Sequence, residues 1–304
     1  MTAQKHRFVL GTVQLGVEYG VNNTTGQPSL DEAFATLDAA FSAGVHTFDT
    51  ARAYGTSEDV IGEWIRSRGH QGRVDVISKM RPKAFESYPE GTSASDIVRT
   101  EIQESLRHLG IDHLDGYLLH MPEHVYRDDV LEGLREAKRA GLVEHIGISI
   151  YDEPEALEAV HRGLDYVQIP YNAFDQRLDK TNFFKLARAA AVTTFARSPF
   201  LKGLLLMEPE RIPPHLAHAR PLVEEFRKIA TRHGLSPIEA ALLVVYQSSA
   251  SFIVFGAETS AQVKEILAIG ERLPSMATEC AEEIQKAFPA VDRSILNPSL
   301  WNRP

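Results

Sequence analysis

The 304-residue sequence lacks several features that would place it in other protein classes. Its one cysteine, Cys280, excludes an intramolecular disulfide and is typical of a reducing compartment. It contains no run of about 18 apolar residues, so we expect no membrane-spanning helix. Acidic residues outnumber basic ones by 41 to 32, and the net charge of −9 argues against nucleic-acid binding, which needs a basic face.

Targeting and linker signals are equally scarce. The first residues, MTAQKHRFVLG, lack the apolar core of a signal peptide, so we expect a cytoplasmic protein. No low-complexity segment or block of like charge divides the chain, and no G-x-G-x-x-G motif follows an apolar run, which argues against a Rossmann-type nucleotide site. What is present, 43% hydrophobic and 24% charged residues, is enough for a packed globular core.

Short apolar runs alternate with amphipathic stretches along the whole sequence. The predicted strands are 8–11, 45–49, 74–79, 113–119, 144–149, 166–169, 192–196 and 252–256. Alternation of this kind predicts a parallel sheet with right-handed crossovers. Eight repeats in about 250 residues favour a closed (β/α)8 TIM barrel over an open doubly wound sheet. We therefore predict one α/β domain that spans residues 1–304.

Three segments of this predicted barrel are expected to wall a substrate pocket. They are the connection 81–93 after the third strand, the proline-rich stretch 204–220 after the seventh, and the tail 276–304, which we expect to be irregular. Their sequences do not specify a substrate, and nothing in the chain indicates an oligomeric state.

Polar residues stand where successive predicted strands end. Asp49 ends the second strand, Lys79 the third and His120 the fourth, and Tyr54 follows Asp49 in the segment TFDTARAYGTSED. The carboxyl ends of barrel strands meet at one rim, where active sites lie. Any one of these residues alone is more often structural, as a turn acid, a packed aromatic or a solvated end, but their joint occurrence on neighbouring strands predicts a catalytic group of four.

The chemistry of the four residues is complementary. A tyrosine ordinarily has a pKa near ~10, and a nearby ammonium lowers it, so we expect Lys79, held by Asp49, to lower the pKa of Tyr54. Tyr54 then exchanges protons near neutral pH, and His120 hydrogen-bonds a substrate oxygen. This suits a carbonyl that receives a hydride on carbon and a proton on oxygen, with no metal required.

The segments FDTARAYG, ISK and LLH, in this order, resemble the aldo-keto reductase superfamily, and the resemblance extends from LGTVQLG to GAETSAQVKEI. It implies that Tyr54 is the general acid/base, that Asp49 and Lys79 tune it, and that His120 orients the carbonyl. It also implies an NADP(H) or NAD(H) cofactor across the barrel mouth. The implied small-molecule partner is a carbonyl compound (an aldehyde, a ketone or a sugar) that is reduced to an alcohol, or the alcohol in the reverse reaction.

Four further segments resemble the cofactor-binding segments of that family: GIS, VQIPYN, SPFLKGLL and FGAETSAQVKE. The cofactor-binding residues implied by them are Ser149, Gln168, Ser198, Phe200, Lys202, Gly203, Gly256, Thr259 and Gln262. Ser149 and Gln168 would meet the nicotinamide carboxamide, the next four the pyrophosphate, and the last three the adenosine ribose. The N-terminus of the helix that starts near Ser260 is a plausible anion site.

Four positions depart from the family pattern. Ile150 replaces an asparagine, Glu258 an arginine that meets the 2′-phosphate, and Ile266 an asparagine that reads adenine. Arg197 stands in place of an aromatic residue that stacks on nicotinamide. A carboxylate disfavours a 2′-phosphate and can accept hydrogen bonds from a free ribose, so the preference between NADPH and NADH stays open.

Other functions are compatible with parts of this pattern. The segment HMPEH at 120–124 matches the zinc-peptidase motif H-x-x-E-H, but Pro122 interrupts the helix that such a site needs, and we expect no metal. The same barrel can serve as a nucleotide-binding regulatory module, because fold does not fix function. A cofactor-free barrel lyase or isomerase that uses the tyrosine, lysine and histidine is the third alternative.

Overall fold

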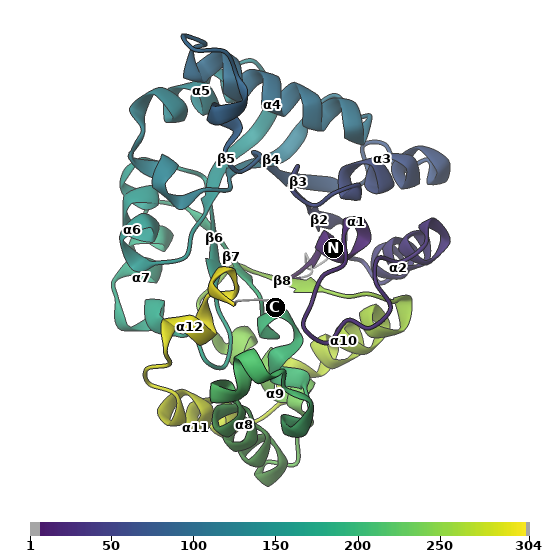
Figure 1. Ribbon diagram of the computed structural model, residues 1–304, viewed down its shortest axis with the longest axis vertical. Coiled ribbons are helices and arrows are strands. Elements are labelled where there is room, and N and C mark those ends of the chain that lie inside the picture. Colours follow the sequence, from purple (N-terminus) through teal and green to yellow (C-terminus); the bar gives the residue numbers. More distant parts are fainter. Residues whose placement is uncertain (1–6, 302–304) are drawn as a thin grey trace.

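A computed structural model describes residues 7–301, and eight parallel strands close into a barrel in it. Each strand pairs with the next in sequence, and the last pairs with the first, as Figure 1 shows down the barrel. The strands are β1 (Phe8–Gly11), β2 (Thr47–Asp49), β3 (Asp75–Lys79), β4 (Leu114–Leu119), β5 (Val143–Ser149), β6 (Tyr166–Pro170), β7 (Thr193–Arg197) and β8 (Phe252–Gly256). The single-domain (β/α)8 prediction is confirmed, and predicted strand ends differ by at most two residues.

Helices follow the strands and form an outer layer (Figure 1). They are α1 (Val13–Gly16), α2 (Leu30–Ser42), α3 (Ser57–Arg68), α4 (Ala94–Leu109), α5 (Asp128–Arg139), α6 (Glu153–His161), α7 (Phe183–Ala189), α8 (Arg220–Arg232), α9 (Pro237–Gln247), α10 (Ser260–Arg272), α11 (Glu279–Ala287) and α12 (Arg293–Leu296). No helix within residues 7–301 is both long and apolar enough to cross a membrane.

Local sequence signals set the ends of these helices. Ser29 and Glu32 form a reciprocal capping box at the start of α2, which satisfies two otherwise free backbone N–H groups. At the C-terminal end of α4, Gly110 adopts a left-handed conformation with a φ of 64°, which is unfavourable for residues that have a side chain. The helix boundaries are therefore encoded locally.

Two apolar layers hold the barrel together. The interior is filled by a small cluster comprising Val9, Ile77, Leu118, Phe195 and Val254, each from a different strand. A much larger layer lies between the strands and the helices. The interior is thus a packed core rather than a channel, and a ligand site has to lie at one end of the barrel.

The segments after β3 and β7 consist mainly of turns. Residues 81–93 include a short 3-10 turn, Ala84–Ser87. Residues 204–220 contain further 3-10 turns at Pro209–Arg211 and Pro214–Ala219 before α8 begins at Arg220.

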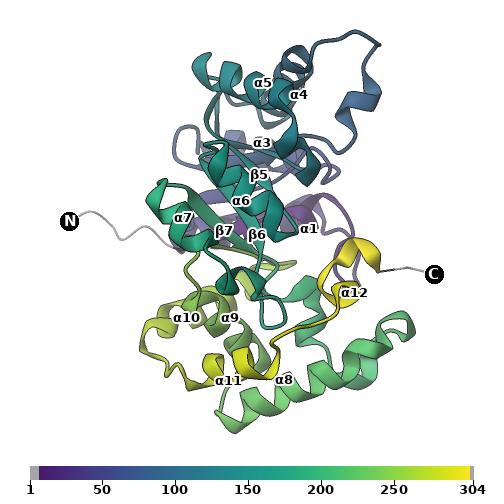
Figure 2. The same ribbon diagram turned by 90° about the vertical axis from the view of Figure 1, so that its left-hand side faces the viewer.

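The tail is more regular than the sequence led us to expect. Beyond Met276 it forms α11 and α12, so the prediction of an irregular tail is wrong for residues 279–287 and 293–296; residues 302–304 lie outside the described part of the chain. The cause is an apolar face, since Cys280, Ala281 and Ile284 are buried on one side of α11. Figure 2 shows α12 on the same side of the barrel as α1, which follows the carboxyl end of β1.

Candidate active site

The four predicted catalytic residues lie together at the carboxyl ends of β2, β3 and β4. The ammonium of Lys79, fully buried, donates to both carboxylate oxygens of Asp49 at 2.8 and 2.7 Å and to the carbonyl oxygen of Thr50 at 2.9 Å. Its Nζ atom lies 5.1 Å from the centroid of the Tyr54 ring. The His120 ring meets the Tyr54 ring edge-on, with centroids 5.9 Å apart.

The ionisation of Tyr54 differs from the sequence-based expectation. Its pKa is raised above the ordinary value, first because the surrounding side chains remove it from water and second because the Asp49 carboxylate lies near. Lys79 does not reverse this effect, since its three ammonium hydrogens are directed to Asp49 and Thr50. The phenol therefore stays protonated at neutral pH and is suited to donate a proton.

His120 is neutral in this setting. Its pKa is lowered to about 3, mainly by burial and further by the positive charges of Lys79 and Arg197. Its Nδ1 atom is buried and has no hydrogen-bond partner among the described residues. A neutral imidazole has one N–H group to donate, so His120 can bind a carbonyl oxygen without adding charge to the site.

The turn that carries Tyr54 is packed tightly against α1. A side chain on Gly16 would overlap the carbonyl oxygen of Tyr54 and would lie 2.5 Å from the backbone nitrogen of Ser57. Across this contact, Gly55 has a φ of 55° and its backbone lies against Gly16. Glycine is required at both positions, and their close approach fixes the position of the Tyr54 turn.

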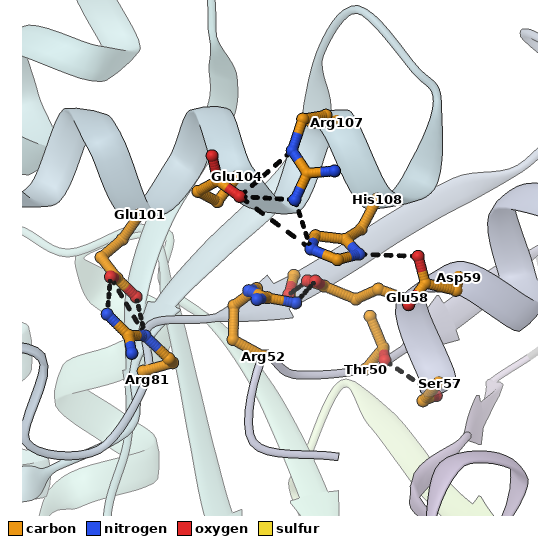
Figure 3. Close-up of polar contacts among 11 residues, drawn as sticks. Thr50, Arg52, Ser57, Glu58, Asp59, Arg81, Glu101, Glu104, Arg107 and His108 are labelled. Atoms are coloured by element: carbon orange, nitrogen blue, oxygen red, sulfur yellow. Dashed lines mark hydrogen bonds and ion pairs between the residues drawn. The ribbon is translucent and has the colours of Figure 1, made fainter. Parts of the chain in front are cut away.

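The turn that carries Tyr54 is also held by hydrogen bonds to Glu58, which were not predicted from the sequence. Arg52 lies between Asp49 and Tyr54, and its Nη1 atom donates to the buried Glu58 carboxylate at 2.9 Å. The hydroxyl of Ser78, adjacent to Lys79 in β3, donates to the other Glu58 oxygen at 2.6 Å. Figure 3 shows Arg52 and Glu58 side by side. Glu58 thus joins the Tyr54 turn to the strand that carries Lys79.

Further ion pairs surround this contact (Figure 3). The guanidinium of Arg81 binds Glu101 of α4 with two nitrogens, at 2.6 to 3.1 Å, and the Tyr88 hydroxyl donates to the same carboxylate at 2.9 Å. Segment 81–93 is therefore anchored on α4. On the outer surface, His108 contacts Asp59 at 2.6 Å, which joins α4 to α3.

A cleft opens beside the four catalytic candidates. It is lined by Asp49 and Tyr54 together with six predicted cofactor-binding residues: Gln168, Ser198, Phe200, Lys202, Gly203 and Gly256. Thr12 and Gln14, which were not among the predicted binding residues, also line the cleft. Their signal was the TVQ segment directly after β1, at the same rim as the other strand ends.

The three other cofactor candidates lie beside the cleft rather than in its lining. Ser149 ends β5 and accepts a hydrogen bond from Arg197 at 3.3 Å. Thr259 caps α10 by accepting from the backbone N–H of Gln262 at 3.2 Å. The Gln262 side chain in turn accepts from the backbone of Glu258 at 2.7 Å. These contacts order the start of α10, next to Gly256.

Gln168 has a different contact from the one expected. Its amide nitrogen donates to the Asp49 carboxylate at 2.8 Å, on the oxygen that also accepts from Lys79. The residue is buried and lines the cleft. It therefore helps to hold Asp49 in place, and its remaining amide oxygen can still accept a hydrogen bond.

The backbone after β7 is strained where it borders the cleft. Ser198, Leu201 and Lys202 have φ values of 62°, 47° and 52°, a left-handed conformation that costs non-glycine residues energy. Gly203 follows with a φ of 91°. Turns of this kind direct backbone N–H groups into a concave surface that binds anions. Together with the Lys202 ammonium, this segment fits the phosphates of a dinucleotide.

The structure shows the burial and contacts of three of the four residues that depart from the family pattern. Ile266 is buried in the apolar layer, so it packs α10 rather than facing a ligand. Ile150 is fully buried, and its carbonyl oxygen accepts from Arg197 at 3.0 Å. Glu258 is half-buried, and burial raises its pKa.

The HMPEH segment does not form a zinc-peptidase helix. It continues from β4 into a 3-10 turn, Pro122–Tyr126. The ring of His120 packs on Tyr54, whereas that of His124 packs edge-on against Phe85 with centroids 5.0 Å apart. The two histidines therefore have separate surroundings.

Comparisons with known proteins point to one family. The family model described as "Aldo/keto reductase family" matches residues 7–286. Aldo-keto reductase str7 of Strobilurus tenacellus is 29% identical over 269 residues, which cover 81% of this chain and 77% of the relative. Aldo-keto reductase YhdN of Bacillus subtilis is 26% identical over 285 residues, covering 86% and 83%.

A solved structure agrees at the level of the fold. Aldo-keto reductase AKR11C1 from Bacillus halodurans, in its holo form, matches with a TM-score of 0.75 over 96% of this chain and 95% of that chain. The sequence identity is 21%, so this likeness concerns the (β/α)8 architecture alone.

Proposed function

The chain belongs to the aldo/keto reductase family of oxidoreductases, and from this premise we propose that it interconverts a carbonyl compound and its alcohol with NADP(H) or NAD(H). Tyr54 is the proposed general acid/base. The observation that carries this proposal is the position of Tyr54, which lines the cleft and lies between the Lys79–Asp49 pair and the ring of His120.

Each of the four residues has a defined task in the proposed reaction. When bound, the dinucleotide would supply a hydride, that is, a proton with two electrons, to the carbonyl carbon. Tyr54 donates its phenolic proton to the carbonyl oxygen, so the C=O bond becomes C–OH, and Tyr54 regains a proton from solvent. The N–H group of His120 orients the oxygen. The adjacent Lys79 ammonium, held by Asp49, stabilises the phenolate that forms.

The residues that would hold the dinucleotide follow from the cleft. The backbone of 198–203 and the ammonium of Lys202 are suited to its phosphates. The N-terminus of α10, capped by Thr259, offers further N–H groups next to Gly256. By family resemblance, Ser149 and Gln168 would contact the carboxamide.

Nucleotide binding and turnover with Tyr54→Phe as the matched variant test this proposal. NADPH and NADH are titrated separately against protein fluorescence, and a panel of aldehydes, ketones and sugars is then tested. We expect Tyr54→Phe to retain nucleotide affinity and to lose about 10²–10⁴ in kcat, the contribution of general acid catalysis.

Each alternative function gives a different result in the same assay. No binding of either nucleotide would exclude the reductase. Turnover that persists after nicotinamide is removed would support a lyase or isomerase. Nucleotide binding without reduction of any carbonyl compound would favour the regulatory module.

Nucleotide preference is tested through Glu258. Because its half-buried carboxylate lies beside the start of α10, we propose that it disfavours a 2′-phosphate. Glu258→Gln is expected to tighten NADPH binding relative to NADH by about 1 kcal/mol, roughly fivefold in Kd. Glu265→Gln, an exposed carboxylate on the same helix, is the charge-matched control. An equal change in both variants would rule out a specific role for Glu258.

A further inference from the structure

Three buried hydroxyl groups form a hydrogen-bonded chain next to the four catalytic candidates. They belong to Thr12, Thr50 and Ser57, which are all 0% exposed. The Thr50 hydroxyl donates to Ser57 Oγ at 3.0 Å, a contact drawn in Figure 3, and the Ser57 hydroxyl lies 2.8 Å from Thr12 Oγ1 and 2.9 Å from the Thr12 carbonyl oxygen. The Thr12 hydroxyl donates to the carbonyl oxygen of Asp49 at 3.0 Å. Since each hydroxyl has one hydrogen to donate, the chain runs in one direction, from Thr50 to the backbone of Asp49.

Ser57 is bonded to both of the elements that the proposed reaction has to align. It is the first residue of α3, and its backbone N–H donates to the carbonyl oxygen of Tyr54 at 3.0 Å. Its hydroxyl accepts from Thr50, whose own carbonyl oxygen accepts from the Lys79 ammonium at 2.9 Å. Ser57 therefore links the turn that carries the proton donor to the backbone group that anchors the ammonium.

The packing around Ser57 leaves its bonds exposed neither to solvent nor to free movement. A methyl group on Gly16 would lie 2.8 Å from Cβ of Ser57 and 2.5 Å from its backbone nitrogen. A hydroxyl that loses its partner in such a place stays buried and unsatisfied, which costs more free energy than the bond itself contributes. Removal of Ser57 Oγ would therefore drive the Thr50 side chain toward another acceptor, and the Thr50 carbonyl oxygen would move with it.

We propose that Ser57 is a positioning residue of the carbonyl reduction, whose hydroxyl holds the Lys79 ammonium in register with the phenol of Tyr54. Ser57 is not among the residues that line the cleft, so it acts through Thr50 rather than by touching substrate or cofactor. The inference rests on the reductase function proposed above and deepens the account of its catalytic group.

The chemistry of the proposed reaction makes this alignment matter. Tyr54 becomes a phenolate when it gives its proton to the substrate oxygen, and the Lys79 ammonium stabilises that charge. The ammonium is oriented by the two Asp49 oxygens and the Thr50 carbonyl oxygen. A shift of the third acceptor turns or displaces the ammonium, and displacements on the order of 1 Å in a catalytic group can lower a rate by about 10²-fold.

The test removes the chain one hydroxyl at a time. Ser57→Ala removes the central hydroxyl, Thr50→Val removes the donor and keeps the shape of the side chain, and Thr50→Ser keeps the donor and removes a methyl group. Ser105→Ala removes a hydroxyl that is equally buried, on α4, outside the chain, and serves as the control. The substrate is the member of the aldehyde, ketone and sugar panel that the wild-type protein reduces fastest.

We expect kcat to fall about 10–100-fold in both Ser57→Ala and Thr50→Val, while KM and the Kd of NADPH and NADH stay unchanged. Thr50→Ser should retain most of the wild-type kcat, because the donor to Ser57 is still present. The double variant Ser57→Ala/Thr50→Val should be no slower than either single variant, because both substitutions break the same bond. Nucleotide affinity and circular dichroism show that each variant is folded.

Each result decides between this inference and another reading. Selective loss of kcat with rescue by Thr50→Ser and no further loss in the double variant supports it. Wild-type kcat in Ser57→Ala, additive losses in the double variant, or an equal loss in Ser105→Ala overturns it. Weaker nucleotide binding with unchanged kcat also overturns it and assigns Ser57 to support of the cleft wall at Thr12. If the wild-type protein binds neither nucleotide and reduces no member of the panel, the reductase proposal itself fails.

Discussion

The contact between Glu58 and Arg52 allows a quantitative test of how the Tyr54 turn is held. Glu58 is only 1% exposed, and its carboxylate binds the Arg52 guanidinium at 2.9 Å and the Ser78 hydroxyl at 2.6 Å. The substitution Glu58→Ala leaves a largely buried cation and a buried hydroxyl without their acceptor. Breaking a buried ion pair from one side costs about 3–5 kcal/mol of unfolding free energy.

An exposed ion pair in the same region provides the comparison. Glu104 and Arg107 on α4 are bonded at 2.7 Å, but their side chains are 44% and 63% exposed. An exposed pair of this kind contributes only about 0–1 kcal/mol. Glu104→Gln should therefore shift the urea midpoint far less than Glu58→Ala, although both substitutions remove one carboxylate (Figure 3).

A double-mutant cycle measures whether Glu58 and Arg52 are energetically coupled. If the cost of Glu58→Ala comes from the stranded Arg52 cation, adding Arg52→Met should restore part of the stability, because neither partner is then left unpaired. Equilibrium urea unfolding of the two single variants and the double variant measures this coupling. Arg52 lies in the turn that carries Tyr54, and Ser78 is next to Lys79 in β3. Glu58→Ala should therefore lower kcat by a larger factor than it weakens nucleotide binding.

The reasoning would be refuted by either of two results. One is a Glu58→Ala midpoint within error of the Glu104→Gln midpoint, which would mean that the buried pair contributes no more than an exposed one. The other is strict additivity of Glu58→Ala and Arg52→Met, which would mean that the two side chains are not energetically coupled.

Two further predictions concern the same site. Gly16→Ala should destabilise the fold by about 1–3 kcal/mol and reduce kcat, because the added methyl overlaps the Tyr54 carbonyl; wild-type kcat in this variant would contradict the packing argument. The pKa of His120 is about 6.5 in the unfolded chain and about 3 in the folded protein, so below pH 6.5 the unfolded state binds a proton that the folded state does not. The free energy of unfolding is therefore unaffected by His120 above about pH 6.5 and decreases as the pH falls toward 3. The urea midpoint of His120→Asn should therefore decline less between pH 7.5 and 5 than that of the wild type, and parallel curves would disprove the assignment.

The residues at the ends of the strands show which part of the candidate site could be predicted from the sequence. Asp49, Lys79 and His120 each follow an apolar run, and the alternation of strands and helices implies a barrel whose carboxyl ends meet. Their proximity could therefore be predicted without coordinates. Cofactor candidates such as Gln168 and Lys202 came from resemblance, and the structure adds their shared cleft.

The partners of these side chains could not be predicted in the same way. Nothing local to Glu58 identifies Arg52 and Ser78 as its partners, because the Ser78 contact is 20 residues away in sequence. The tail was misjudged for the same reason, since α11 is stabilised by what it packs against. A short helix gains most of its stability from tertiary contacts rather than from propensity.

The sequence by itself determined the (β/α)8 barrel, the strands to within two residues at each end, and the rim that carries Tyr54, because hydrophobic period and capping residues act over a few neighbouring positions. Only the tertiary structure decided that the pKa of Tyr54 is raised rather than lowered, that Gln168 binds Asp49, and that Arg197 lacks a described carboxylate partner. Desolvation and charge balance depend on every group that surrounds a side chain, and those groups come together only when the barrel closes.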